Sequence, residues 1–170
     1  MRPMNEDDWD ILLKWNSDPA VLYFSEGDDV VAYDLEQVQQ IYRGVSQKAF
    51  CFIIEFDGNV IGDCWLQEMN LERILEQYPG MDCRRIDLII GEKGFWGQGL
   101  GTDVIRTLTR FGFEQEKADV ICGVSIGDHN PRSLKAFQNA GYRVIAKTEE
   151  SPGRKARFSY DLAITREEAV

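Results

Sequence analysis

Three glycines at alternate positions are the strongest chemical signal in the sequence. Gly97, Gly99 and Gly101 lie in the stretch "FWGQGLGTDVI", between an apolar strand-like run and a helix-like pattern that opens at Thr102. A helix N-terminus presents unpaired backbone N–H groups and the positive end of the helix dipole, and glycine lets the backbone come close to a phosphate. The order of strand, glycine-rich loop and helix therefore predicts an anion site that binds a phosphate group.

The loop matches neither of the two commonest nucleotide-binding motifs. The P-loop pattern G-x-x-x-x-G-K-[ST] is absent, and the dinucleotide pattern G-x-G-x-x-G needs a third glycine where this chain has Thr102 or Val104. A loop whose glycines only allow a flexible turn is the alternative interpretation. The strand before the loop and the regular helix after it favour the phosphate site.

Asp87 is the second chemical signal, because a carboxylate is unusual at the entrance to an apolar strand. It stands in "RRIDLIIGE", where three apolar residues follow it. A buried charge is costly without a partner, and titratable groups in such surroundings are enriched at functional sites. This favours a functional role for Asp87. An ordinary ion pair with Arg84 or Arg85 is the alternative that the sequence leaves open.

The composition narrows the classes of function. The chain has 170 residues, which suits a single domain over residues 1–170, and a net charge of −10. This charge argues against nucleic-acid binding and is compatible with a cationic small-molecule substrate. Four scattered cysteines and a single histidine, His129, argue against a metal site, a disulfide framework and a Ser-His triad. The sequence shows no transmembrane run and no secretory signal, so we expect no membrane partner and a cytoplasmic protein.

The residues around these signals predict a mixed fold of strands and about four helices. We expect strands at the N-terminus and at residues 49–56, 60–67, 84–92, 118–126, 142–148 and 157–164. We expect helices at residues 8–18, 35–45, 102–115 and 129–141, and a short helix within an insertion at 69–82. Residues 19–33, rich in aromatic and acidic side chains, are expected to form a loop.

The glycine loop and a second motif resemble those of the GNAT superfamily of N-acetyltransferases. "FWGQGLGTDVI" resembles the loop that binds the acetyl-CoA pyrophosphate, with Trp96 where Gln or Arg is usual. "HNPRSLKAFQNAGYRV" resembles the motif N-x-x-S-x-x-x-Y-x-x-x-G-F/Y, which Asn130, Ser133, Gly141 and Tyr142 match. The resemblance covers essentially the whole chain. It implies an α/β (α+β) fold of the GNAT type, with a mixed, mostly antiparallel central sheet flanked by helices, and acetyl-CoA as cosubstrate.

Within the superfamily the chain is most similar to the aminoglycoside 6′-N-acetyltransferases, which confer antibiotic resistance. The similar stretches are "VLYFSEGDD", the acidic insertion before the central strand, and "MDCRRIDLIIGE". This likeness implies acetyl transfer to an amine of a cationic aminoglycoside, by direct attack of the amine on the thioester. A protonated amine must first lose a proton, so a base is required. We expect a monomer or a homodimer.

The resemblance assigns roles to individual residues. It makes Asp87 the catalytic base and a ligand of the substrate amine, and it places a backbone N–H donor for the thioester oxygen near Ile89. The residues that it assigns to acetyl-CoA are Ile89, Ile90, Gln98, Gly99, Leu100, Gly101, Thr102, Asn130 and Phe137. Phe137 stands where the family often has a tyrosine that protonates the departing thiolate. Tyr142 matches a packing aromatic of the motif and is a poor substitute.

The substrate side is assigned as a group to two segments that line the acceptor cleft in the family. The candidate contacts for a cation are Glu26, Asp28, Asp29, Glu68, Glu72, Glu76 and Asp82, in addition to Asp87 of the central strand. The candidate walls are Tyr23, Phe24, Trp65 and Tyr78. From these, Tyr23, Glu26, Asp28, Glu68 and Asp87 are our expected substrate-binding residues. For each residue taken singly, a solvated loop charge or a core aromatic is the alternative.

The chain departs from the aminoglycoside pattern in two further places. Relatives often read I-G-Y-x-Q in the hairpin, where this chain reads "IGDCW", and Asp-Pro after the glycine helix, where this chain has Ser125 and Ile126. Asp63 and Asp128 are candidates to compensate. Two other functions stay open: acylation of a protein N-terminus or a siderophore amine, and a GNAT-fold module that binds acetyl-CoA without catalysis.

Overall fold

One mixed sheet organises the chain. The computed structural model describes residues 1–26, 30 and 32–169. Its strands are β1 (Arg2–Pro3), β2 (Ala49–Phe56), β3 (Asn59–Glu68), β4 (Cys83–Ile90), β5 (Val120–Gly127), β6 (Arg143–Glu149) and β7 (Phe158–Thr165). They lie in the order β1-β2-β3-β4-β5-β7-β6, and only the pair β4–β5 is parallel. The predicted mixed and mostly antiparallel sheet is confirmed.

The helices differ from the prediction in one place. They are α1 (Trp9–Asn16), α2 (Pro19–Ser25), α3 (Leu35–Val45), α4 (Glu72–Leu75), α5 (Leu100–Glu114) and α6 (Pro131–Asn139). The prediction of a loop from residue 19 was wrong for α2. Asp18 accepts the Ala20 N–H at 2.9 Å, Pro19 occupies the first helical position, and Val21 and Leu22 are buried. These are the ordinary start signals of a helix.

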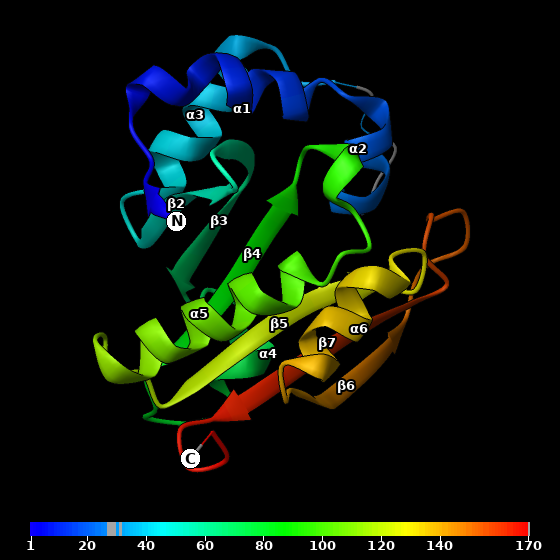
Figure 1. Cartoon of the computed structure of the whole chain (residues 1–170). Helices are drawn as coiled ribbons and strands as arrows, with labels where there is room; N and C mark the ends of the chain where they lie inside the picture. Colours follow the sequence, from blue (N-terminus) through cyan, green and yellow to red (C-terminus); the bar gives the residue numbers. More distant parts are fainter. Residues whose placement is uncertain (27–29, 31, 170) are drawn as a thin grey trace.

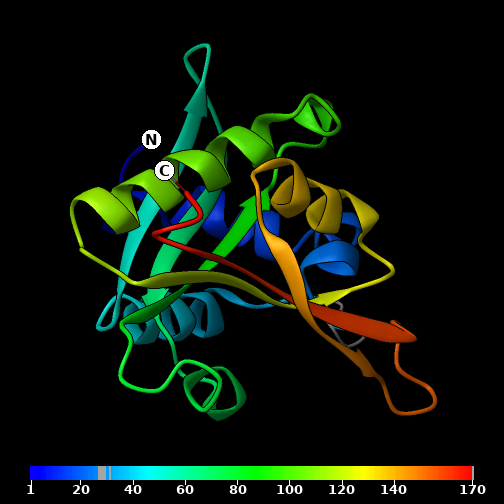
Figure 2. The ribbon, with the colours of Figure 1, turned by 90° about the horizontal axis from the view of Figure 1, so that it is seen from below.

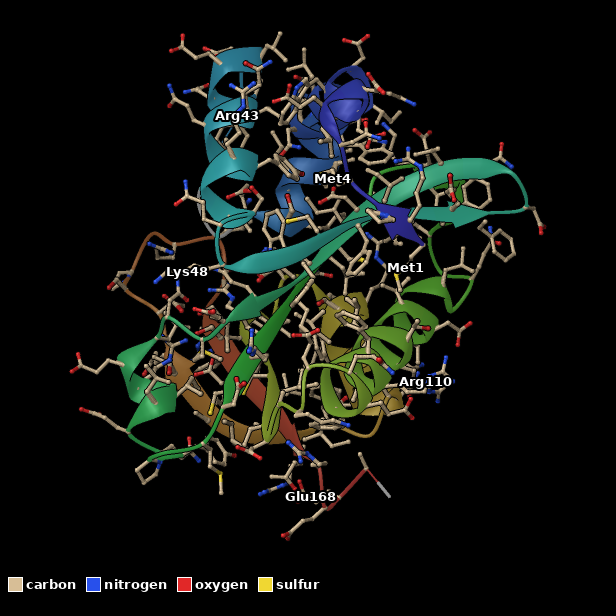
Figure 3. All side chains as sticks on the ribbon, turned by 90° about the vertical axis from the view of Figure 1, so that its left-hand side faces the viewer. Met1, Met4, Arg43, Lys48, Arg110 and Glu168 are labelled. Atoms are coloured by element: carbon tan, nitrogen blue, oxygen red, sulfur yellow. The ribbon has the colours of Figure 1, made fainter. Side chains whose placement is uncertain are left out.

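Helices cover both faces of the sheet. In Figures 1 and 2, α5 and α6 lie on one face, and α1 and α3 lie on the other. The core on the α5 face includes the buried side chains Leu66, Ile86, Ile105, Leu108 and Phe137. The core on the α1 and α3 face includes Leu12, Trp15, Val38, Tyr42 and Ile53. Figure 3 shows side chains filling the space between the sheet and its helices, with Arg110 pointing outward from α5. Among the described residues, no helix has the length and apolar character needed to cross a bilayer.

Strands β4 and β5 separate after a short paired stretch. They pair only at Cys83–Arg85 of β4, while β4 stays paired with β3 as far as Ile90. Figure 1 shows the two strands diverging toward the glycine loop. The register of β5 shifts between Gly123 and Ile126, and Ser125 has a left-handed φ of +53°. The sheet is therefore open between β4 and β5, and we call this opening the splay.

Two side chains support the irregular turn of β5. Asp161 of β7 is buried and accepts the Ser125 N–H at 2.8 Å. Arg73 of α4 forms an ion pair with Asp161 at 2.8 Å and donates to the Ser125 hydroxyl at 2.9 Å. A bulge of this kind re-aims a strand and terminates its pairing. The insertion at 69–82 thus helps to hold the splay open.

Candidate active site

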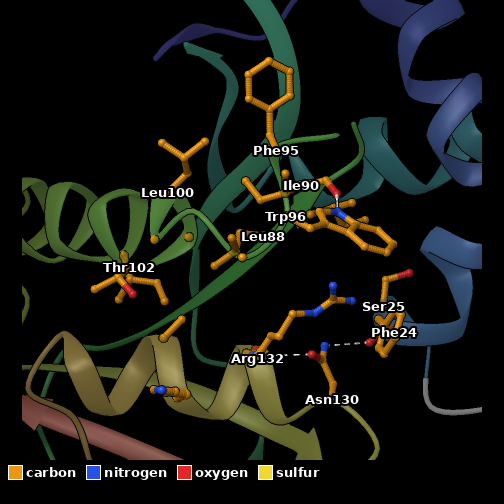
Figure 4. A pocket seen from close by; sticks show the side chains of 18 of the residues that line it. Phe24, Ser25, Leu88, Ile90, Phe95, Trp96, Leu100, Thr102, Asn130 and Arg132 are labelled. Atoms are coloured by element: carbon orange, nitrogen blue, oxygen red, sulfur yellow. Dashed lines mark hydrogen bonds between the residues drawn. The ribbon is translucent and has the colours of Figure 1, made fainter. Parts of the chain in front are cut away.

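One cavity lies at the glycine loop, and we call it the loop cavity. It has a volume of about 450 Å³ and is lined by the end of β4, residues 95–97 and 99–102, the end of α2 and one side of α6 (Figure 4). Gly97 and Gly99 have φ angles of +76° and +84°, which favour glycine. Gly99 is the N-cap of α5 and has no side chain to cap the helix. The first backbone N–H groups of α5 therefore lack a capping side chain.

The backbone N–H groups of the loop differ in whether they are free to bind an anion. Leu100 and Gly101 open α5, where N–H groups have no partner within the helix. The Thr102 N–H donates to the Gly99 carbonyl at 2.9 Å and is already paired. The Gln98 side chain turns away and donates to the Gly94 carbonyl at 2.8 Å. The amides of residues 98–101 are thus the better placed candidates for an anion.

Two cationic side chains of α6 also line the loop cavity. They are Arg132 and Lys135, and we had not assigned either of them to the site. The Arg132 guanidinium lies 4.3 Å from the ring centre of Phe24 and 4.2 Å from that of Trp96 (Figure 4). Such stacking is favourable because an aromatic face attracts a cation. It holds a positive charge beside the glycine loop.

Asn130 joins α6 to α2. Its side-chain oxygen accepts the Ser133 N–H at 3.2 Å, as an N-cap does, and its side-chain nitrogen donates to the Phe24 carbonyl at 3.0 Å. Both ends of this amide are therefore engaged by the protein. Asn130 lines the loop cavity as expected, and the structure gives it a positioning role at the cavity wall.

The second cavity lies on the α1 and α3 face of the sheet, and we call it the acidic cavity. It has a volume of about 330 Å³, and the carboxylates of Glu26, Asp63 and Asp87 are among the groups that line it. Leu88 and Ile89 of β4 line both cavities. The two cavities therefore meet at the splay, where a molecule bound in one can reach a molecule bound in the other.

The direction of the peptide groups in β4 decides which amides face the splay. A Cβ on Gly62 of β3 would collide with the Ile89 carbonyl, so the Ile89 peptide group points toward β3. Along a strand, the backbone N–H and C=O groups of successive residues point to alternate sides. Those of Leu88 and Ile90 therefore point toward the splay. The Ile90 carbonyl there accepts the indole N–H of Trp96 at 2.6 Å. The amides of Leu88 and Ile90, more than that of Ile89, can donate to a group in the splay.

A sequence model described as "Acetyltransferase (GNAT) domain" matches residues 1–143. The chain belongs to the GNAT acetyltransferase family. Similar solved structures include the aminoglycoside acetyltransferase AAC(6')-Ib with ribostamycin and coenzyme A, at 22% identity, a TM-score of 0.80, and coverage of 98% of this chain and 93% of that one. Spermidine N-acetyltransferase from Vibrio cholerae, with CoA and spermine, matches at 14% identity and a TM-score of 0.78, covering 99% and 95%. Mycobacterium smegmatis RimJ with CoA-disulfide matches at 18% identity and a TM-score of 0.77, and the match covers 98% of this chain and 81% of that one.

The family makes the chain an acetyl-CoA-dependent N-acetyltransferase. The loop cavity fits this cosubstrate in its chemistry. Backbone amides at a helix N-terminus suit a pyrophosphate, and Arg132 and Lys135 add positive charge to the same wall. The apolar side chains Leu88 and Ile90 continue the cavity toward the splay. A GNAT enzyme needs such a passage to bring its thioester to the acceptor amine.

The acidic cavity contains buried polar atoms that the protein leaves without hydrogen bonds. In the described part of the chain these atoms are Asp63 Oδ1, Trp65 Nε1 and the ring nitrogens of His129, beside which a backbone group of Tyr23 lies. Asp63, Trp65 and His129 line this cavity. Buried polar atoms usually have partners, so their concentration in one cavity indicates a place for a polar ligand.

Asp63 and Asp87 differ in their surroundings. Asp63 is 2% exposed, and burial raises its pKa to about 7, which the Tyr42 hydrogen bond partly opposes and the nearby Asp87 charge reinforces. Asp87 instead forms a two-point ion pair with Arg85, at 2.8 and 2.7 Å. The predicted alternative of an ion pair for Asp87 is thus present, and Asp87 still lines the cavity.

Of the other predicted substrate-binding residues, some line the acidic cavity and some do not. Glu26 lines the acidic cavity. Tyr23 is 47% exposed and lies outside the linings of both cavities, with its ring packed against Phe24 and His129. Glu68 lies at the far end of β3, opposite Arg84, and also lies outside both linings. Asp28 lies outside the described residues.

Phe137 and Tyr142 form a buried aromatic pair. Phe137 is 2% exposed, its ring centre lies 5.0 Å from that of Tyr142, and it lines the acidic cavity rather than the loop cavity. The Tyr142 hydroxyl lies 2.6 Å from the Thr109 hydroxyl in the core, and burial raises the pKa of Tyr142 far above its ordinary value. This supports the assignment of Tyr142 as a packing residue.

Proposed function

We propose that this acetyltransferase acetylates a primary amine of a cationic aminoglycoside. The observation that carries the proposal is the acidic cavity: carboxylates and unpaired polar atoms line a space that meets the acetyl-CoA passage at the splay. Carboxylates attract ammonium groups, and an acidic cleft raises the local concentration of cations. The similarity to an aminoglycoside acetyltransferase solved with ribostamycin supports this choice of substrate.

The reaction joins an amine nitrogen to the acetyl carbon and breaks the bond from that carbon to sulfur. The amine enters as an ammonium ion, which Asp87 would hold, and it must become neutral before it attacks. As the nitrogen attacks, negative charge grows on the thioester oxygen. The amide of Leu88 or Ile90, facing the splay, would stabilise this charge. Asp87 is the base that the family resemblance predicts.

Acetyl-CoA would lie along the loop cavity. Its pyrophosphate would bind the amides of residues 98–101, with the Arg132 guanidinium beside it. Its pantetheine arm would pass the side chains of Leu88 and Ile90 into the splay. Asn130 and Phe137 would shape the wall of this passage from α6. The position of Phe137 offers no proton donor, so a water molecule would protonate the thiolate.

A matched pair of drugs tests both the activity and its position. Neomycin B and paromomycin I differ only at the 6′ carbon, which carries an amine in the first and a hydroxyl in the second. Release of free thiol from acetyl-CoA, measured with each drug, should be rapid with neomycin B and much slower with paromomycin I. Equal rates would place the acetylated amine elsewhere on the drug.

Three further amines separate this proposal from its competitors. Spermine is a linear cation, and its inclusion is motivated by the similarity to a spermidine N-acetyltransferase. A peptide with a free N-terminus and a siderophore hydroxylamine represent the two other acceptor classes. Turnover with one of these and with no aminoglycoside would overturn the aminoglycoside proposal. Tight CoA binding without any turnover would identify a binding module.

A further inference from the structure

Asp63 is a buried carboxylate in the middle of the sheet. It lies on β3 directly opposite Ile89 of β4, so the two side chains share the face that carries the acidic cavity. Asp87 lies one step further along the same face, opposite Trp65. Asp63 lies one strand away from the splay, but its cross-strand neighbour Ile89 borders both cavities, so Asp63 stands beside the point where they meet.

One oxygen of Asp63 is fixed and the other is available. The Tyr42 hydroxyl donates to Asp63 Oδ2 at 3.1 Å, and the Asn16 side chain donates to the Tyr42 oxygen at 3.3 Å and to the Leu12 carbonyl at 2.8 Å. Asp63 Oδ1 is buried and has no hydrogen bond in the described part of the chain. Helices α1 and α3 therefore orient the carboxylate and leave one oxygen for a ligand in the cavity.

The neighbouring carboxylate, Asp87, already has a cationic partner. Both oxygens of Asp87 accept hydrogen bonds from Arg85, whose side chain is 20% exposed. Among residues 1–26, 30 and 32–169, no arginine or lysine forms an ion pair with Asp63. Burying a carboxylate without a cation is unfavourable, and a protein that keeps one at a cavity has a use for it.

We propose that Asp63 is a second catalytic carboxylate, which takes the proton from the acceptor ammonium while Asp87, paired with Arg85, holds that ammonium in place. This inference rests on the proposed function, because it requires an amine in the acidic cavity. It assigns to Asp63 the role of base that the family resemblance gives to Asp87. The available Oδ1 of Asp63 is the atom that receives the proton.

The protons and electrons balance as follows. The ammonium gives one proton to Asp63 Oδ1, and the freed lone pair attacks the acetyl carbon. When the carbon–sulfur bond breaks, its electron pair leaves with the CoA sulfur. The new amide nitrogen gives up a second proton, which a water molecule carries to the thiolate. Asp63 releases the first proton to solvent after the product leaves, so the cycle yields an amide, free CoA and one proton.

Several groups determine the charge on Asp63. Tyr42 of α3 faces it, as do Cys51 of β2 and Asp87 of β4, and Arg85 and His129 line the same cavity. Burial dominates and raises the pKa of Asp63 to about 7. A base with a pKa near the working pH is the most effective one. Activity should therefore rise as the pH increases through about 7, because only the ionised carboxylate accepts a proton.

The test compares three variants in the thiol-release assay with neomycin B. Asp63→Asn should lower kcat at pH 8 by about 10²–10⁴-fold. It should also abolish the fall in kcat/KM at acid pH, which we call the acid limb. Asp87→Asn should raise KM for the drug more than it lowers kcat. Asp57→Asn, on the exposed turn of the same hairpin, should match the wild type. An active Asp63→Asn enzyme that keeps the acid limb would overturn the inference.

A fourth variant tests the orientation of Asp63 without removing it. Tyr42→Phe deletes the hydroxyl that lowers the pKa of Asp63, so the acid limb should move to higher pH. An unmoved limb would contradict the assignment of that limb to Asp63. CoA binding and thermal unfolding confirm that each variant is folded. Wild-type protein without turnover on any amine would overturn the proposed function and this inference together, whereas an unaffected Asp63→Asn enzyme overturns the inference alone.

Discussion

The loop cavity and the acidic cavity are built in opposite ways. The first depends on backbone from one continuous stretch, in which Gly97 and Gly99 bend the chain into the N-terminus of α5. The second depends on side chains from α1, α3, β3, β4 and the turn before α6, which meet only in the folded protein. The difference indicates that the two cavities suit different kinds of ligand. Backbone amides can hold an invariant cosubstrate, while side chains can be exchanged to fit a variable acceptor.

The largest expected effect is on the unfolding free energy of the protein, through Asp63 in the acidic cavity. A carboxyl group whose pKa is raised by folding lowers the unfolding free energy once the pH exceeds its ordinary pKa, which is 3.8 for Asp63. The lowering reaches its full size above the pKa in the folded protein, about 7. At pH 8 the buried Asp63 charge should therefore cost on the order of 4 kcal/mol. Asp63→Asn should recover much of this at pH 8 and far less at pH 5. Urea unfolding at both pH values measures the difference.

Asp57→Asn is the matched control for this measurement. Asp57 is exposed at the β2–β3 turn with a left-handed φ of +48°, a conformation that asparagine also tolerates. Its unfolding free energy should equal that of the wild type at both pH values. If Asp63→Asn had the same effect at pH 5 and pH 8, the raised pKa of Asp63 would be refuted. A gain in stability with a loss of activity would show that the enzyme retains Asp63 for its chemistry.

The next effect concerns the backbone of the loop cavity. Gly99→Val places a β-branched residue at a φ of +84°, which such residues avoid, so the loop should relax and its amides should turn away from the proposed pyrophosphate site. Acetyl-CoA binding should weaken about tenfold or more, which corresponds to about 1.4 kcal/mol. Isothermal titration with CoA measures this change.

Gly94→Val is the control in the same loop. Gly94 has no atom near the position of a Cβ and no positive φ. The same substitution should therefore leave CoA binding close to the wild-type value. Equal losses in Gly94→Val and Gly99→Val would show that bulk in the loop, and not the direction of its amides, controls binding.

The sequence predicts the loop cavity better than the acidic cavity because the signals for the first are local. Strand, glycines and helix follow one another, so the anion site and the start of α5 can be inferred from neighbouring residues. Local signals for α2 were also present in Asp18 and Pro19, and the aromatic and acidic composition of the segment obscured them. The splay could not be inferred, because it depends on Arg73 meeting Asp161 across the fold.

The acidic cavity depends on register and burial, which sequence alone leaves undetermined. Glu68 and Asp63 both lie on β3, yet only Asp63 is central enough to meet the cavity. The sequence marks Asp63 only as a departure from the family pattern, and nothing in "IGDCW" shows that this residue is 2% exposed. Arg132 was missed because its partners, Phe24 and Trp96, come from two other segments.

A smaller effect is expected at the α6 wall of the loop cavity, where Arg132 lies. Arg132→Ala removes the cation that packs against the rings of Phe24 and Trp96, which should lower the unfolding free energy by about 1 kcal/mol and weaken CoA binding. Arg132→Lys keeps the charge and loses the planar stack. If the phosphates need the charge, the lysine variant should bind CoA better than the alanine variant at low salt. Equal binding by both would assign Arg132 to packing alone.

A change in stability alone, with no change in CoA binding, is expected at the buried pair of Thr109 and Tyr142. Tyr142→Phe removes a hydroxyl that lies 2.6 Å from Thr109 Oγ1, while that oxygen keeps its bond to the Ile105 carbonyl at 2.7 Å. The unfolding free energy should fall by about 1 kcal/mol, the usual loss for one buried hydrogen bond. The value of kcat should not change, because this hydroxyl is buried in the core against Thr109 and lines neither cavity. A fall in kcat with an altered alkaline limb would instead make Tyr142 the proton donor that Phe137 lacks.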